Sequence, residues 1–252
     1  MSRLKKLLAF LILLTLATPL AVSVKALAPQ PATQQKQALI ISSLNSTMPM
    51  GADGTLEVNY LKGMGYNTTY IVDSSVTVGF VLHNLPNYSV VIWRTNYYIS
   101  QHTVYWYIGQ PVSGEVEQQY ATDFSYGWLN AHAGVIGMTG DFIQNHFKSG
   151  ALKNIKLLIF VGSYGNSIVP SFLTAGVRTV IFCNGIISLQ GGLIDDLTVS
   201  MLDYMAKGQD VNAAVFNTVS PYAQYTQPQD QYDTTYAPPF WYNGDGSLVL
   251  VQ

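Results

Sequence analysis

Two side chains in this sequence are singled out as candidate nucleophiles, Ser163 and the single cysteine, Cys183. Ser163 lies in the turn Gly162-Ser163-Tyr164-Gly165, directly after an apolar run. Its hydroxyl can attack a carbonyl only if a neighbouring base takes its proton, and the turn lacks the Gly-x-Ser-x-Gly pattern of hydrolases. Cys183 directly follows Ile181 and Phe182, so we predict that it is a small buried hydrophobic residue. One cysteine also excludes an internal disulfide and a Cys-x-x-Cys site.

A base for Ser163 would have to come from one of four histidines. His102 lies six residues beyond Asn96 in an irregular stretch, and His132 lies in Ala131-His132-Ala133-Gly134. His83 and His146 fall on predicted helices, where surface or packing roles are expected. A hydrolase that uses Ser163 with His102 or His132 is therefore one hypothesis.

Metal and cofactor chemistry finds little support in the sequence. Asp195 and Asp196 open a predicted helix, where carboxylates ordinarily interact with the helix dipole and the free N–H groups, so we favour that role over metal binding or acid–base catalysis. The glycine-rich turn at 162–165 precedes a helix but lacks the lysine of a phosphate-binding loop. We predict no metal and no cofactor.

Strands and helices alternate along residues 37–252, which we assign to one domain. Apolar or β-branched runs predict strands, and helical patterns lie between most of them; the strand runs are 38–41, 68–72, 89–93, 155–161, 179–183 and, closing the chain, 247–251. This pattern predicts an α/β fold with a mostly parallel, roughly six-stranded sheet and helices on both faces.

A long excursion at residues 96–134 interrupts this alternation. It is rich in Tyr, Gln, Ser and Gly, and we expect one or two short hairpins in it. Tyr97, Tyr98 and Trp106 are candidates for a ligand-contact surface, since such rings give large, rigid contacts. The alternative is that these rings simply cover the edge of the sheet.

The N-terminus has the pattern of an export signal. Basic residues precede an uncharged apolar run from 7 to 24, and cleavage after Ala26 would remove residues 1–26. An uncleaved membrane anchor is the alternative, and it would be the protein's only contact with a membrane. Residues 27–36 form a Pro/Gln-rich spacer. We therefore expect a secreted or extracytoplasmic protein associated with the cell surface.

Charge argues against a nucleic-acid partner. Without residues 1–26 the chain has eight basic and 14 acidic residues, a net charge of −6, and no basic patch. In an exported chain, three Asn-x-Ser/Thr sequons could make it a glycoprotein, at Asn45, Asn67 and Asn87.

Sites in α/β sheets lie beyond the carboxyl ends of strands, which here draws attention to Asn96 and Ser163. Several segments around them resemble the CHAT or gingipain type of caspase-like domain. They read Leu85-Pro86-Asn87-Tyr88-Ser89-Val90-Val91-Ile92-Trp93-Arg94-Thr95-Asn96, Ala175-Gly176-Val177-Arg178-Thr179-Val180-Ile181, Lys207-Gly208-Gln209-Asp210-Val211-Asn212-Ala213-Ala214 and Tyr242-Asn243-Gly244-Asp245-Gly246-Ser247-Leu248.

The resemblance implies a caspase-like fold, in which a Cys–His dyad cleaves peptides and the last strand runs against its neighbour. The family's cysteine falls on Ser163 and its histidine on Asn96, so neither catalytic residue is retained. The resemblance therefore implies a degenerate peptidase that binds a protein, a peptide or a cell-surface component, or acts in surface assembly.

Overall fold

The computed structural model describes residues 36–47, 49, 52–184, 193–221 and 240–251. The predicted signal segment at 1–26 and most of the predicted spacer at 27–36 lie outside these residues. Within the described part of the chain, no helix combines the length and the apolar character needed to cross a bilayer.

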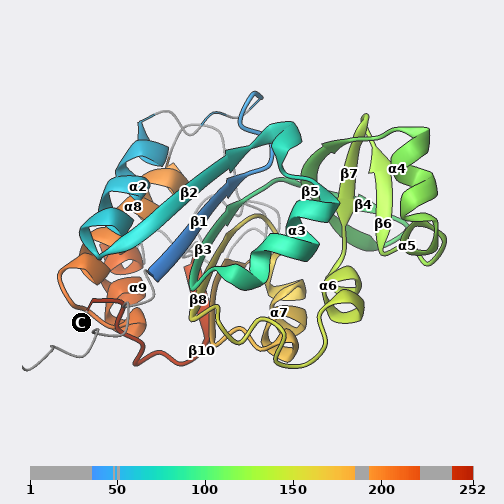
Figure 1. Ribbon diagram of the computed structural model, residues 1–252. Coiled ribbons are helices and arrows are strands. Elements are labelled where there is room, and N and C mark those ends of the chain that lie inside the picture. Colours follow the sequence, from blue (N-terminus) through green and yellow to red (C-terminus); the bar gives the residue numbers. More distant parts are fainter. Residues whose placement is uncertain (1–35, 48, 50–51, 185–192, 222–239, 252) are drawn as a thin grey trace, which may run out of the picture. The chain divides into compact units, whose positions relative to one another are not determined.

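A six-stranded sheet forms the centre of the domain (Figure 1). Its strands lie in the order β10-β9-β8-β3-β1-β2. Five strands of this sheet are mutually parallel, namely β1, β2, β3, β8 and β9, and β10 runs antiparallel to β9. The predicted α/β fold with a mostly parallel sheet is therefore confirmed. The strands are β1 (Lys36–Ser42), β2 (Tyr66–Val72), β3 (Val90–Arg94), β8 (Leu157–Val161), β9 (Thr179–Cys183) and β10 (Phe240–Gly244).

Helices cover both faces of the sheet because the central strands are apolar on both sides. Every residue of β3 and β8 is buried. Alternate residues enter two separate cores: Leu39 and Ile41 pack on one face, Ala38 and Ile40 on the other. The first core receives α3 (Val78–Asn84), α6 (Gly140–His146) and α7 (Val169–Ala175); the second receives α2 (Asp53–Gly63), α8 (Leu193–Ala206) and α9 (Val211–Val219).

The excursion at 96–134 folds into most of a second, antiparallel sheet with the order β4-β5-β7-β6. The predicted hairpins are present: β4 pairs with β5, and β6 pairs with β7. Two short helices lie between the hairpins, α4 (Gly114–Gln119) and α5 (Ala121–Ser125). The strands are β4 (Tyr97–Ser100), β5 (Thr103–Pro111), β6 (Leu129–His132) and β7 (Val135–Met138), and single 3-10 turns lie at η1 (Asp73–Ser75), η2 (Leu85–Asn87) and η3 (Gly165–Ser167).

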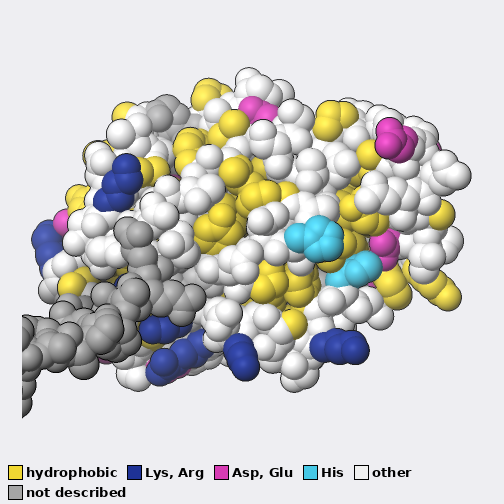
Figure 2. All heavy atoms as spheres, viewed as in Figure 1, with side chains coloured by type: hydrophobic (Ala, Val, Ile, Leu, Met, Phe, Trp, Pro, Cys, Tyr) yellow, Lys and Arg dark blue, Asp and Glu magenta, His cyan; other side chains and the backbone are white. Residues whose placement is uncertain are grey.

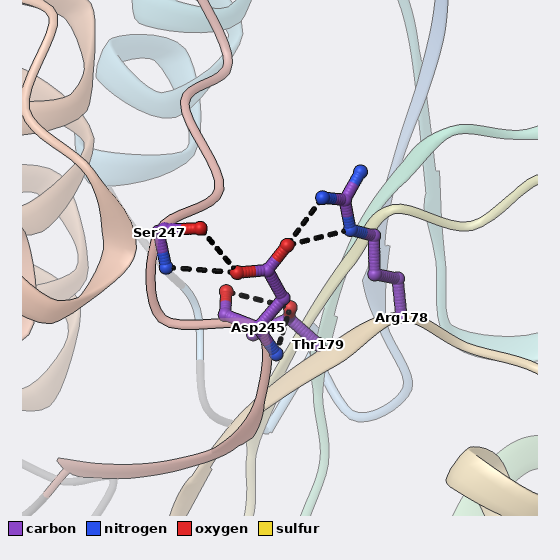
Figure 3. A network of polar contacts seen from close by, with 4 residues as sticks. All are labelled: Arg178, Thr179, Asp245 and Ser247. Carbon is purple, nitrogen blue, oxygen red and sulfur yellow. Dashed lines mark hydrogen bonds and ion pairs between the residues drawn. The ribbon is translucent and has the colours of Figure 1, made fainter.

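The predicted closing strand at 247–251 is wrong, because β10 lies earlier in the chain. After Gly244, at φ 109°, the chain turns at Asp245, whose Oδ1 accepts hydrogen bonds from the backbone N–H and the hydroxyl of Ser247 (Figure 3). Arg178 binds the other carboxylate oxygen. The segment beyond this turn caps α9, since the carbonyl of Leu248 accepts the N–H of Val211. Its apolar residues therefore fill the core under α9 instead of joining the sheet.

Candidate functional site

Asn96 and Ser163 follow the carboxyl ends of β3 and β8, two neighbouring central strands. Both positions therefore lie at the edge of the sheet that is formed by the carboxyl ends of its parallel strands. Arg94 is the register partner of Val161, and the N–H of Thr95 continues the ladder by donating to the carbonyl of Val161 at 3.0 Å. Asn96 and Ser163 each lie two residues beyond that register pair. These two positions, 67 apart in the sequence, therefore come from neighbouring strand ends.

Short-range contacts fix both positions. The Oδ1 atom of Asn96 accepts the backbone N–H of Tyr97 at 2.8 Å. Ser163 is 2% exposed, and its carbonyl oxygen accepts a 2.9 Å hydrogen bond from Nε1 of Trp106. Gly162 allows the two strand ends to approach closely, because a Cβ atom there would come within 3.2 Å of Thr95.

Tyr97 and Tyr164 form a ring pair beside this edge. Their centroids lie 5.0 Å apart at an interplanar angle of 73°, and both residues are half-buried. Tyr164 has φ 56° and ψ 29°, a left-handed conformation that is uncommon for a bulky side chain and is often found at functional sites. Burial and the neighbouring Tyr164 raise the pKa of the Tyr97 hydroxyl. No sequence signal marks Tyr164 beyond its place in the glycine-rich turn at 162–165.

Two of the three predicted contact residues do not offer a surface. Trp106 is 1% exposed and packs edge-on against Phe160 at 5.7 Å. Tyr98 is 8% exposed because its ring lies between those of Tyr105 and His132. The prediction is wrong for Tyr98 and Trp106, whose rings hold the four-stranded sheet together and attach it to β8.

The two histidines proposed as bases, His132 and His102, lie away from the contact between Trp106 and Ser163. His132 stacks on Tyr98, and its Nδ1 lies 2.6 Å from the hydroxyl of Tyr107. Tyr107 and Trp106 are consecutive in β5, so their side chains point to opposite faces of the sheet. His102 is exposed at the turn of the β4–β5 hairpin, four residues or roughly 13 Å along the chain from Trp106. The arrangement does not favour a Ser163–His pair.

The other two histidines lie on helices, as predicted: His83 on α3 and His146 on α6. Figure 2 shows two histidine side chains next to each other over these helices. His146 Nε2 lies 2.7 Å from the buried carboxylate of Asp123, which ties α6 to α5. No set of three or more His, Cys, Asp or Glu residues within the described ranges could hold a metal ion.

Cys183 is buried, which confirms its predicted role as a small hydrophobic residue. It lies at the end of β9, where it is the register partner of Phe240, with no exposed surface. Burial raises the pKa of its thiol well above the ordinary value. A thiol held in this protonated state is a poor nucleophile.

A buried charge cluster at the same edge was not predicted. Asp195 does not act only as a helix-start residue: its carboxylate accepts two hydrogen bonds from Arg94, 2.8 Å from Nε and 3.2 Å from Nη2. Both side chains are less than 5% exposed. Asp196 is exposed, as expected for the first turn of a helix. Glu57 of α2 is 1% exposed, and burial together with the charge of Asp195 raises its pKa to about 8.

The three sequons differ in exposure. Asn67 and Asn87 are exposed, whereas Asn45 is half-buried and accepts a hydrogen bond from the hydroxyl of Tyr70 at 3.2 Å. Asn67 donates to Gln37, and Asn87 donates to the carbonyl of His83. Glycosylation at these three positions stays a prediction.

Comparison with known proteins adds no family. The sequence matches no protein-family model, and no curated protein matches it.

Proposed function

We propose that this chain is an exported, catalytically degenerate domain of the caspase-like type, which binds a protein or peptide partner without cleaving it. One observation carries the proposal: Asn96 and Ser163 lie at equivalent positions on neighbouring strand ends, where the resembled family has histidine and cysteine. The sheet order, with only β10 reversed, agrees with that resemblance.

The residues at this edge support binding better than chemistry. An asparagine amide does not take up a proton at neutral pH, so Asn96 cannot activate Ser163. The Tyr97–Tyr164 pair, in contrast, offers two partly exposed rings at the same edge, and the backbone of Tyr164 is in the left-handed conformation. Aromatic rings of this kind often anchor a peptide partner.

The test is to incubate the secreted domain with a library of extended peptides and to measure retention and cleavage separately. We expect retained peptides to be intact. The variant Tyr97→Ala/Tyr164→Ala should bind about tenfold or more weakly, because it removes the aromatic anchors. Tyr126→Ala is the matched control, since Tyr126 is 67% exposed and follows α5.

Two results would contradict the proposal. Cleavage at defined bonds that disappears in Ser163→Ala would favour the hydrolase hypothesis instead. Unchanged binding in the double tyrosine variant would exclude this edge as the contact surface.

Export has a separate test. Mass spectrometry of the mature protein should find an N-terminus near Leu27, with the protein outside the cytoplasm. An intact N-terminus on membrane-bound protein would support the anchor alternative.

A further inference from the structure

Glu57 is a buried acid with an unsatisfied oxygen. Its Oε2 atom has no hydrogen-bond partner among the described residues. A buried carboxylate is strongly disfavoured unless it is paired, so Glu57 is held as the neutral acid at moderate pH.

Arg94 and Asp195 join the end of β3 to the first turn of α8. Their paired hydrogen bonds link residues 101 positions apart, and α8 also packs against α2, which carries Glu57. Arg94 therefore contributes one positive charge to a site that contains several acidic side chains. The groups that interact electrostatically with Glu57 or with this ion pair are Asp53 on α2, Arg94 on β3, Asp195 and Asp196 on α8, and Tyr70 on β2.

We propose that Glu57 and Arg94 form a proton-controlled switch between two helices. When Glu57 releases its proton to solvent, its carboxylate competes with Asp195 for the Arg94 guanidinium, and the first turn of α8 is freed from β3. Arg94 directly precedes Thr95 and Asn96, so the switch acts on the edge described above. It does not depend on what, if anything, binds there.

The direction of the pH effect follows from where the proton is held. The closed form binds the Glu57 proton tightly, with a pKa of about 8, whereas in the open form pairing with Arg94 and contact with water both favour the ionised carboxylate and lower that pKa. Opening therefore becomes easier as pH rises from about 5, by up to about tenfold per pH unit. Above the pKa of the closed form, both forms have lost the proton and the effect levels off.

The first measurement is direct, because the chain contains only three glutamates. Labelling the glutamate side-chain carboxyl carbon with ¹³C gives three NMR signals, from Glu57, Glu115 and Glu117 of the full-length protein. The signals of Glu115 and Glu117, which are exposed on α4, serve as internal references. The Glu57 signal, assigned with Glu57→Gln, should titrate at much higher pH. Titration of all three together would overturn the proposal.

The second measurement tests whether the proton moves the helix. Amide hydrogen exchange of α8, corrected for the intrinsic effect of pH, should accelerate between about pH 5 and pH 8 relative to α7, which packs on the opposite face. In Glu57→Gln, which keeps a neutral side chain, this acceleration should vanish, whereas Glu117→Gln should behave as wild type. A high Glu57 pKa without any change in α8, or an unchanged pH response in Glu57→Gln, would disprove the switch. If Glu57→Gln does not fold, the ratio of α8 to α7 exchange in the wild type still decides.

Discussion

The indole Nε1 of Trp106 donates a 2.9 Å hydrogen bond to the carbonyl oxygen of Ser163. Trp106 belongs to the four-stranded sheet, and Ser163 belongs to the turn that follows β8 of the six-stranded sheet. Both residues are almost fully buried. This contact therefore attaches the small sheet to the edge of the large sheet at the candidate site.

Replacing Trp106 by Phe should lower the free energy of unfolding by about 1–3 kcal/mol. The ring would still pack against Phe160, but the buried carbonyl of Ser163 would lose its indole donor. Urea denaturation measures the difference. Trp241→Phe is the control, because Trp241 is 51% exposed and its replacement should change stability by less than about 0.5 kcal/mol. Equal effects in the two variants would mean that the contact is unimportant.

Restoring the family's dyad is the sharpest test of the caspase-like proposal. In the variant Asn96→His/Ser163→Cys, the thiol should be paired with the imidazole, and its pKa should lie at least about one unit below that in Ser163→Cys alone. The rate of iodoacetamide labelling against pH measures both values. Identical titration of the two thiols would show that these positions do not form a dyad.

Breaking the buried ion pair should be strongly destabilising. Arg94→Met leaves the Asp195 carboxylate buried without its guanidinium, so we expect a loss of about 3–5 kcal/mol in denaturant unfolding. The double variant Arg94→Met/Asp195→Leu should recover most of this loss, since no charge is stranded. Additive losses in the double variant would contradict this account.

The turn at Asp245 should make stability sensitive to acid. The Ser247 hydroxyl, Arg178 and the Ser247 N–H all stabilise the ionised carboxylate and lower the pKa of Asp245. Its contribution to stability is therefore complete above the usual carboxyl pKa of about 4 and is lost as pH falls through the lower pKa of the folded state. Asp245→Asn should lose less stability on acidification than wild type in thermal melts. Asp203→Asn, which removes an exposed helical pair with Lys207, should retain the wild-type acid response.

Continuous apolar runs predicted four of the five parallel strands, because strands buried on both faces need such residues throughout, and β-branched residues predicted the partly exposed β2. The same rule failed at 247–251, where Leu248 and Leu250 are buried beneath a helix and not in a sheet. An apolar run shows that a segment is buried, but it does not show which element covers it.

The candidate site was predicted in part, for a related reason. Neighbouring strand ends placed Asn96 beside Ser163, because topology alone determines that arrangement. The Arg94–Asp195 pair could not be predicted, since it joins residues from distant segments and a local rule already explained Asp195 as a helix-start residue. The burial of Tyr98 and Trp106 could not be predicted from the sequence either, because it depends on which rings stack across the hairpins.

The capping of α9 by the end of the chain has a consequence for biosynthesis. The N–H groups of Val211 and Asn212 are bonded to the carbonyls of Leu248 and Gly246, and β9 gains its outer neighbour only from β10. A growing polypeptide that has not yet extended past Leu250 lacks these contacts, although β1 to β8 have long been synthesised. Completion of this domain therefore depends on residues 240–250, and a polypeptide truncated before β10 leaves β9 as an open sheet edge, a target for chaperones and proteases.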